Sequence, residues 1–262
     1  MTASLVLPLL AGLGSGVATN YVADSLPASR RLTRPVCVQC GTPFPWGAYL
    51  TGTPCGTCGH GRGLRPWIVL AAMITLSVYT WFQPHRMGYV LGLLLLTYFA
   101  VVVIVDLEHR LILHPTSIVG ALLAAGIGLW VRGAEPTLLG GLVGGGVMLV
   151  LYAIGLLFTR LRTRRLRAMG QEPDGEDALG WGDVILGGIL GLVLGWPLIG
   201  LGLFLGILLG GIIGLALIIA TIVRGRYRQQ ALMVFMPYGP AFVLSAFLIL
   251  FLPSLISGIV PK

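Results

Sequence analysis

Long apolar segments alternate with short polar segments along the chain. A helix needs roughly 20 apolar residues to cross the hydrocarbon core of a bilayer, and seven segments approach or exceed that length: 5–22, 67–82, 88–105, 115–131, 138–159, 184–223 and 238–260. The sixth covers 40 residues and therefore predicts two helices. We expect the break at Gly195-Trp196-Pro197, because proline removes a backbone donor and disfavours helix at the preceding residue. The pattern predicts an all-α fold, a polytopic membrane bundle of about eight transmembrane helices.

The longest polar interruption follows the first apolar segment and divides the chain into three parts. Residues 1–22 are the first transmembrane helix, residues 23–66 a small loop, and residues 67–262 a seven-helix transmembrane core. A cleavable signal peptide is the alternative for the first segment. It lacks a basic leading region and a distinct small-residue cleavage site, so a retained helix is preferred.

Composition and charge agree with a membrane protein. The chain is 56% hydrophobic and 10% charged, whereas soluble domains carry about 25% charged residues. Cytoplasmic loops carry the excess of Lys and Arg, and all but Arg86, Arg132 and Lys262 of the 17 basic residues fall on odd-numbered loops. This distribution places both termini outside and the first loop in the cytoplasm. The lipid bilayer around the core is therefore an expected partner. The net charge of +8 is explained by this topology, and a nucleic-acid partner is not expected.

Glycine recurs at four-residue intervals in two of the predicted spans. Gly187, Gly191 and Gly195 form one stripe, and a second comprises Gly202, Gly206, Gly210 and Gly214. This spacing places each stripe on one helix face, where backbones approach closely. Tight helix packing is the interpretation. A phosphate-binding loop is not indicated, since no lysine or threonine follows in the required pattern.

All four cysteines lie in the first loop, as two C-x-x-C pairs separated by fourteen residues: Cys37, Cys40, Cys55 and Cys58. Two such pairs bring four thiolates onto one tetrahedral zinc ion, and the glycine after each pair tolerates the positive φ of a tight turn. Two disulfides are the alternative, but they rarely persist in the reducing cytoplasm. His60 is an alternative ligand or a solvated loop residue. Four thiolates close the coordination shell, which predicts a structural zinc.

Only two aspartates are expected to abut the predicted spans. Asp106 ends the third span and Asp183 begins the sixth, both at the cytoplasmic boundary. Two carboxylates brought close share a proton, because both cannot readily ionise. The ionised member then takes a proton from water while the protonated member polarises a carbonyl, as in an aspartic protease. A helix cap at Asp183 and a water-boundary residue at Asp106 are the alternatives.

The residues around these aspartates resemble a known family. Gly180-Trp181-Gly182-Asp183 is similar to the GxGD signature of intramembrane aspartyl proteases. Further segments resemble those of the type IV prepilin peptidases and follow one another in the same order: Gly14-Ser15, 20–27, Asp106-Leu-Glu-His-Arg, Asp177-Ala-Leu and Met236-Pro-Tyr-Gly-Pro240. The chain is thus similar to that family over most of its length.

The resemblance implies an activity, a substrate and a location. Asp106 and Asp183 would be the catalytic dyad of an aspartic endopeptidase of the bacterial cytoplasmic membrane, with no catalytic metal. The partner would be a type IV prepilin or pseudopilin, cleaved on the cytoplasmic side between its leader and its hydrophobic helix. Many family members also methylate the new N-terminus with S-adenosylmethionine. The fourteen-residue gap between the cysteine pairs is shorter than is common there, which weakens the methyltransferase inference.

Two further functions are left open by the residues themselves. A proton-coupled transporter also uses acidic residues in spans, although transporter sites usually lie near the midplane. A zinc-binding membrane scaffold would need the cysteines and neither aspartate. The fifth loop contains four acidic residues, Glu172, Asp174, Glu176 and Asp177. They are interpreted either as a solvated segment or as a surface that attracts the basic leader of a substrate. Oligomeric state is not indicated.

Overall fold

The computed structural model describes residues 3–83, 86–168, 180–223 and 238–256. Within these ranges the regular secondary structure is helical, apart from an isolated bridge between Val36 and Pro43. The acidic group 172–177, His85 and the arginines of 224–228 lie outside the described residues.

Each predicted apolar segment is helical over most of its described residues, and the last one, 238–260, forms two short helices over the part that the structure describes. Among the described residues, six helices are long and apolar enough to cross a membrane: α1 (Ala3–Ser29), α3 (Arg65–Phe82), α4 (Gly88–His109), α5 (His114–Arg132), α6 (Ala134–Ala168) and α8 (Leu198–Val223). Two apolar helices are shorter, namely α7 (Trp181–Leu194) and α10 (Gly239–Phe251). The part of the chain that the structure describes also contains two small helices, α2 (Trp46–Thr51) and α11 (Pro253–Ile256). The predicted all-α, multi-pass membrane fold is confirmed.

The predicted break in the 40-residue apolar segment is also confirmed. Helix α7 ends at Leu194 and α8 begins at Leu198. Gly195, with φ of 68°, adopts a backbone conformation that side chains disfavour, and the Trp196 N–H donates to the carbonyl of Pro136 at 2.8 Å. The chain therefore turns at this point into a second, separate helix.

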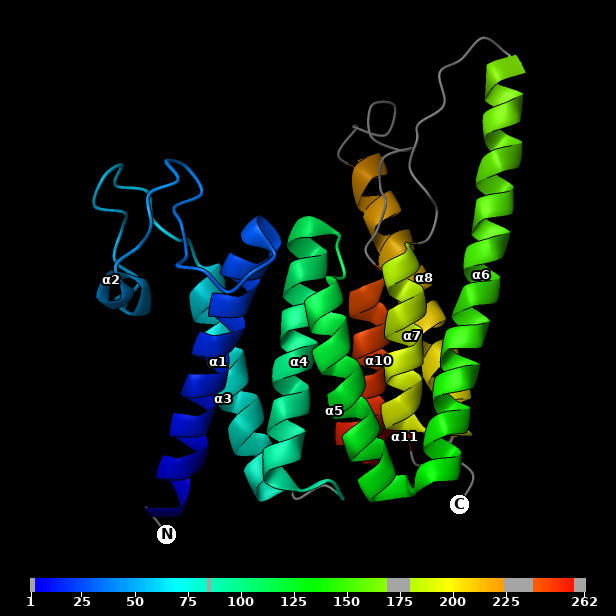
Figure 1. Ribbon diagram of the computed structural model, residues 1–262, viewed down its shortest axis with the longest axis horizontal. Helices are drawn as coiled ribbons and strands as arrows, with labels where there is room; N and C mark the ends of the chain where they lie inside the picture. The colour runs from blue at the N-terminus through cyan, green and yellow to red at the C-terminus, as the bar shows by residue number, and fades with distance from the viewer. Residues whose placement is uncertain (1–2, 84–85, 169–179, 224–237, 257–262) are drawn as a thin grey trace. The chain divides into compact units, whose positions relative to one another are not determined.

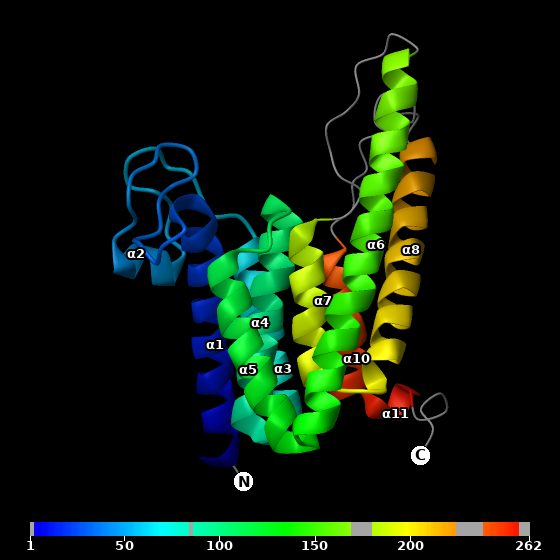
Figure 2. The same ribbon diagram turned by 45° about the vertical axis from the view of Figure 1, so that its right-hand side comes forward.

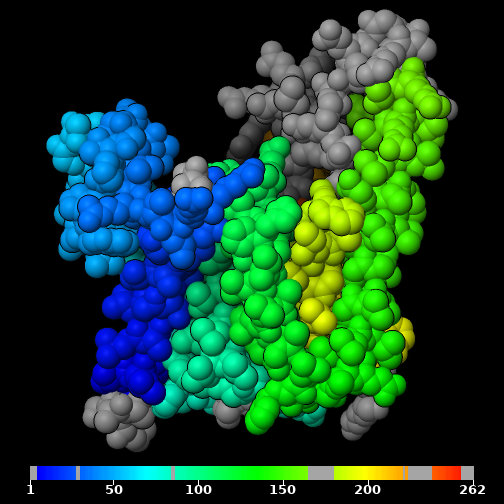
Figure 3. All heavy atoms as spheres, viewed as in Figure 1, coloured from blue at the N-terminus to red at the C-terminus, as the bar shows by residue number. Residues whose placement is uncertain are grey.

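The helices group into two compact units, residues 1–116 and 117–262. In the first unit, α1 packs against α3 and α4. Gly12 of α1 lies so close to α3 that a Cβ there would be 2.7 Å from the Ile74 Cα. At the end of α4, a buried cluster of Ala23, Leu26, Val101, Val105 and Leu113 joins α1 to α4. The loop between α1 and α3 forms a lobe beside the C-terminal half of α1 (Figure 3).

In the second unit, α6 and α7 lie side by side (Figures 1 and 2). Their backbones meet through glycines, and the predicted stripe Gly187, Gly191 and Gly195 forms the α7 side of the contact. In the second stripe, Gly206 and Gly210 of α8 face Phe242 and Tyr238 of the α10 segment. Close helix packing is confirmed for these glycines.

Candidate metal centre and aspartate sites

The four cysteines are presented by two matching turns of the loop. The Gly41 N–H donates to the Cys37 carbonyl and the Gly59 N–H donates to the Cys55 carbonyl, each at 2.8 Å. Both glycines have φ of 70°. The positive φ predicted after each cysteine pair is therefore confirmed.

The turns bring all four sulfur atoms together. Their Sγ atoms lie within 4.8 Å of one another, with Cys37 and Cys58 3.6 Å apart and Cys40 and Cys55 also 3.6 Å apart. A zinc–sulfur bond of about 2.3 Å implies sulfur separations of about 3.8 Å around a tetrahedral ion, whereas a disulfide needs about 2.05 Å. The four cysteines thus form a cluster that fits a structural metal, and His60 lies outside that group.

The pKa values of the thiols in the cluster are shifted in different directions. Hydrogen bonding with the side chain and backbone of Thr42 lowers the pKa of the Cys40 thiol to about 6. Backbone hydrogen bonds at Cys58 and Thr57 lower the pKa of Cys55 as well. Desolvation and side-chain hydrogen bonds with the neighbouring cysteines raise the pKa of Cys58 to about 12. Because metals bind the thiolate form, the lowered pKa values make Cys40 and Cys55 available as ligands at neutral pH, whereas Cys58 would lose its proton on binding a metal.

The cysteine cluster is part of a small hydrophobic core. Cys37 and Cys55 are buried together with Phe44 and Tyr49, and Tyr21 of α1 packs against them. The rings of Tyr49 and Trp46 meet edge to face at 6.4 Å. This core is small for a folded segment, so a metal would supply much of the stability of the loop.

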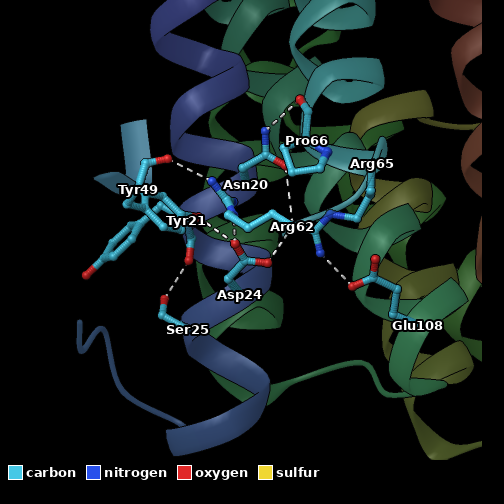
Figure 4. A network of polar contacts seen from close by, with 9 residues as sticks. All are labelled: Asn20, Tyr21, Asp24, Ser25, Tyr49, Arg62, Arg65, Pro66 and Glu108. Atoms are coloured by element: carbon cyan, nitrogen blue, oxygen red, sulfur yellow. Dashed lines mark hydrogen bonds and ion pairs between the residues drawn. The ribbon is translucent and has the colours of Figure 1, made fainter. Parts of the chain in front are cut away.

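Asp24 joins this loop to α1 (Figure 4). Its Oδ2 accepts hydrogen bonds from the Tyr49 hydroxyl at 2.6 Å and from Arg62 at 2.7 Å, and its Oδ1 pairs with Arg65 at 2.5 Å. The Arg62 guanidinium also lies 3.8 Å from the centre of the Tyr49 ring. Burial and the hydrogen bond to Asp24 raise the pKa of Tyr49 far above its usual value, so its hydroxyl stays protonated.

Asp24 corrects the sequence-based expectation that only two aspartates abut the spans. Helix α1 continues past Val22 to Ser29, and its membrane-compatible part runs from Leu5 to Pro27. The missed signal was an acidic residue two positions after the predicted end of the first span. An acidic residue inside such a segment is expected to be partnered or functional, and Asp24 is partnered.

Arg65 extends the same network to α4. Its Nη1 donates to Glu108 Oε2 at 2.7 Å, and its Nη2 lies 3.3 Å from Asn20 Oδ1. Asn20 in turn donates to the carbonyl of Pro66 at 3.1 Å. One arginine at the start of α3 therefore contacts both neighbouring helices of the first unit.

Asp106 occupies the last turn of α4. Asp106 is only 5% exposed. It follows Val105, which belongs to the buried cluster between α1 and α4. Its backbone carbonyl accepts the Arg110 N–H at 2.9 Å, and Arg110 ends the helix in a left-handed conformation. The carboxylate is thus held at a helix end, on the buried side.

Asp183 lies in the first turn of α7, in the second unit. Its Oδ2 accepts the Gly180 N–H at 3.0 Å, and its own N–H donates to the Gly180 carbonyl at 3.1 Å. The side chain therefore caps the helix, as one alternative from the sequence anticipated. The capping bond uses one carboxylate oxygen of Asp183, so the other oxygen could still take part in a reaction. The meeting of Asp106 with Asp183 stays a prediction.

The loop that carries the four cysteines, residues 30–64, is called the metal loop. A cleft of about 790 Å³ lies in the first unit, between this loop and the ends of α1 and α4. Its lining combines apolar residues with ionisable ones, among them Asp24, His60, Arg62, Arg65, Glu108 and His109. The polar network described above forms one wall of this cleft.

Comparison with known families gave one match. Residues 90–215 match the model of the type IV leader peptidase family. The matched segment, a little under half of the chain, is similar to that family. It contains both Asp106 and Asp183, which lie at the ends of α4 and α7. The resemblance found in the sequence is thereby confirmed for this segment, and several of the described helices are long and apolar enough to span a membrane. Neither the curated proteins nor the solved structures gave a match.

Proposed function

We propose that the protein is an aspartic endopeptidase that removes the leader peptide from type IV prepilins or pseudopilins at the cytoplasmic face of the bacterial inner membrane. The observation that carries the proposal is the position of the two aspartates. Both lie inside the segment matched to the leader peptidases, and each is held at the end of an apolar helix. The distribution of basic residues supports a cytoplasmic position for both.

The proposed chemistry needs one proton shared by Asp106 and Asp183. The ionised carboxylate removes a proton from water, whose oxygen then attacks the carbonyl carbon of the scissile peptide bond. The protonated carboxyl group donates a hydrogen bond to the carbonyl oxygen as negative charge develops there. Collapse of the tetrahedral intermediate transfers a proton to the leaving amine and restores the shared proton.

The cysteine cluster has a structural part in this proposal. Cys37, Cys40, Cys55 and Cys58 would hold a zinc ion, and with four thiolates the ion has no open position for water. The metal would stabilise the loop beside α1, and the loop lies outside the segment matched to the peptidase family. Methylation with S-adenosylmethionine stays a prediction from the resemblance.

Cleavage by the purified protein tests the proposal. The wild type, Asp106→Asn and Asp183→Asn are incubated in detergent or nanodiscs with prepilins whose leaders are basic, and the products are read by mass spectrometry. We expect cleavage before the hydrophobic helix by the wild type and by neither variant. Cleavage retained by either variant would remove that aspartate from the mechanism.

A further inference from the structure

Arg65 joins α3 to both α1 and α4 through two ion pairs. It stands at the first position of α3, and its guanidinium is divided between Asp24 of α1 and Glu108 of α4. The fork of an arginine reaches two carboxylates at once, which a lysine ammonium does with less directional control. The side chains of Arg65 and Glu108 are 27% and 35% exposed, so the pair is only partly shielded from water.

Glu108 lies two residues after Asp106, in the turn that ends α4. Helix ends fray, because their last carbonyls lack partners within the helix. The residues that follow Asp106 are exposed, as Leu107 at 58% illustrates. On the buried side this turn is held by the cluster that includes Val105. On the exposed side, the ion pair with Arg65 ties the same turn to α1 and α3.

We infer that Arg65 is a positioning residue for Asp106 and acts through Glu108. Two residues along a helix are separated by about 200° around its axis, so the pair at Glu108 fixes the turn from the side opposite Asp106. With this restraint the Asp106 carboxylate keeps one orientation, and without it the turn samples several. This inference rests on the proposed function, because positioning matters only if Asp106 reacts.

The network gives Arg65 its own support. Asp24 holds one side of the guanidinium and is itself held by Tyr49 and Arg62 of the metal loop. Tyr49 shares a buried core with Cys37 and Cys55. A continuous series of side-chain contacts therefore links the metal loop to the α4 terminus.

Glu108→Gln tests the inference, because glutamine keeps the size of the side chain and removes its charge. We expect kcat to fall about tenfold, the order produced when a reacting group is held less precisely. KM should change less than about twofold, because ground-state binding is retained. Glu108→Asp keeps the carboxylate and should recover most of kcat. Glu135→Gln in α6, an exposed residue, is the matched control and should leave kcat unchanged.

Hydrogen exchange supplies a readout that does not need activity. Amide exchange at residues 107–110 should accelerate in Glu108→Gln and Arg65→Lys and stay at the wild-type rate in Glu135→Gln. Unchanged kcat and unchanged exchange in Glu108→Gln would overturn the inference, and so would faster exchange with unchanged kcat. If the wild type cleaves no prepilin, the proposed function fails. Unchanged amide exchange at residues 107–110 in Glu108→Gln would separately refute the role of the Arg65–Glu108 ion pair.

Discussion

Gly144 of α6 lies directly against Gly187 of α7, so that a methyl carbon at position 144 would be 2.2 Å from the Gly187 carbonyl oxygen. The contact repeats one turn along, where a Cβ on Gly140 would lie 2.3 Å from the Gly191 carbonyl oxygen. Lipid offers no hydrophobic drive for helix association, so close backbone packing supplies much of the attraction. Because Asp183 lies in the first turn of α7, this glycine contact also fixes the helix that carries it.

Replacing Gly144 by alanine should separate α6 from α7. The added methyl group has no space, and overpacking of this kind costs about 1 to 3 kcal/mol. We expect a lower thermal unfolding midpoint in detergent. Gly146→Ala is the control, since a Cβ at position 146 would meet nothing within 4 Å. Equal midpoints for the two variants would show that the α6–α7 contact is looser than described.

The glycine contact illustrates what the sequence determines and what it leaves open. The stripe Gly187, Gly191 and Gly195 follows from four-residue spacing, which is a local property of one helix. Its partner helix does not follow, because spacing within α7 carries no information on which helix it faces. The cysteines are the opposite case, because their short spacing and shared ligand chemistry nearly determine from the sequence alone which residues come together.

The network at Asp24 was harder to anticipate for a physical reason. The excess of positive charge in cytoplasmic loops is a statistical property, and it accounts for Arg62 and Arg65 without any partner. Their pairing with Asp24 joins residues 38 and 41 positions apart. Only the folding of the loop back onto α1 brings these charges together, and no periodicity records such a contact.

Metal content should follow the cysteines and not His60. We expect one zinc ion per chain in the purified wild type and a large loss in Cys37→Ser, because serine is a poor zinc ligand. His60→Ala should retain the metal, since the four thiolates already close the coordination shell. Elemental analysis of protein purified without added zinc gives the measurement. Full zinc in Cys37→Ser, or loss in His60→Ala, would contradict the four-cysteine site.

Asp24→Asn should loosen the metal loop from α1. The substitution removes the charge that pairs with Arg62 and Arg65, and hydrogen bonds to charged groups contribute about 1.5 to 3 kcal/mol each when partly buried. We expect faster proteolysis and faster amide exchange across residues 46–62. Tyr49→Phe removes only one of the three donors and keeps the aromatic ring, so its effect should be clearly smaller. Equal effects would place the hydroxyl, not the ion pairs, at the centre of the network.

Asp183 combines a capping contact with a proposed catalytic role, and two substitutions separate them. Asparagine retains an oxygen that can accept the Gly180 N–H, so Asp183→Asn should keep the thermal stability of the wild type while cleavage is lost. Alanine removes the cap as well, and Asp183→Ala should cost about 1 kcal/mol of stability in addition. Thermal unfolding and prepilin cleavage are measured on the same preparations. If Asp183→Asn cleaves normally and only Asp183→Ala is impaired, capping accounts for the residue and the shared proton must be placed elsewhere.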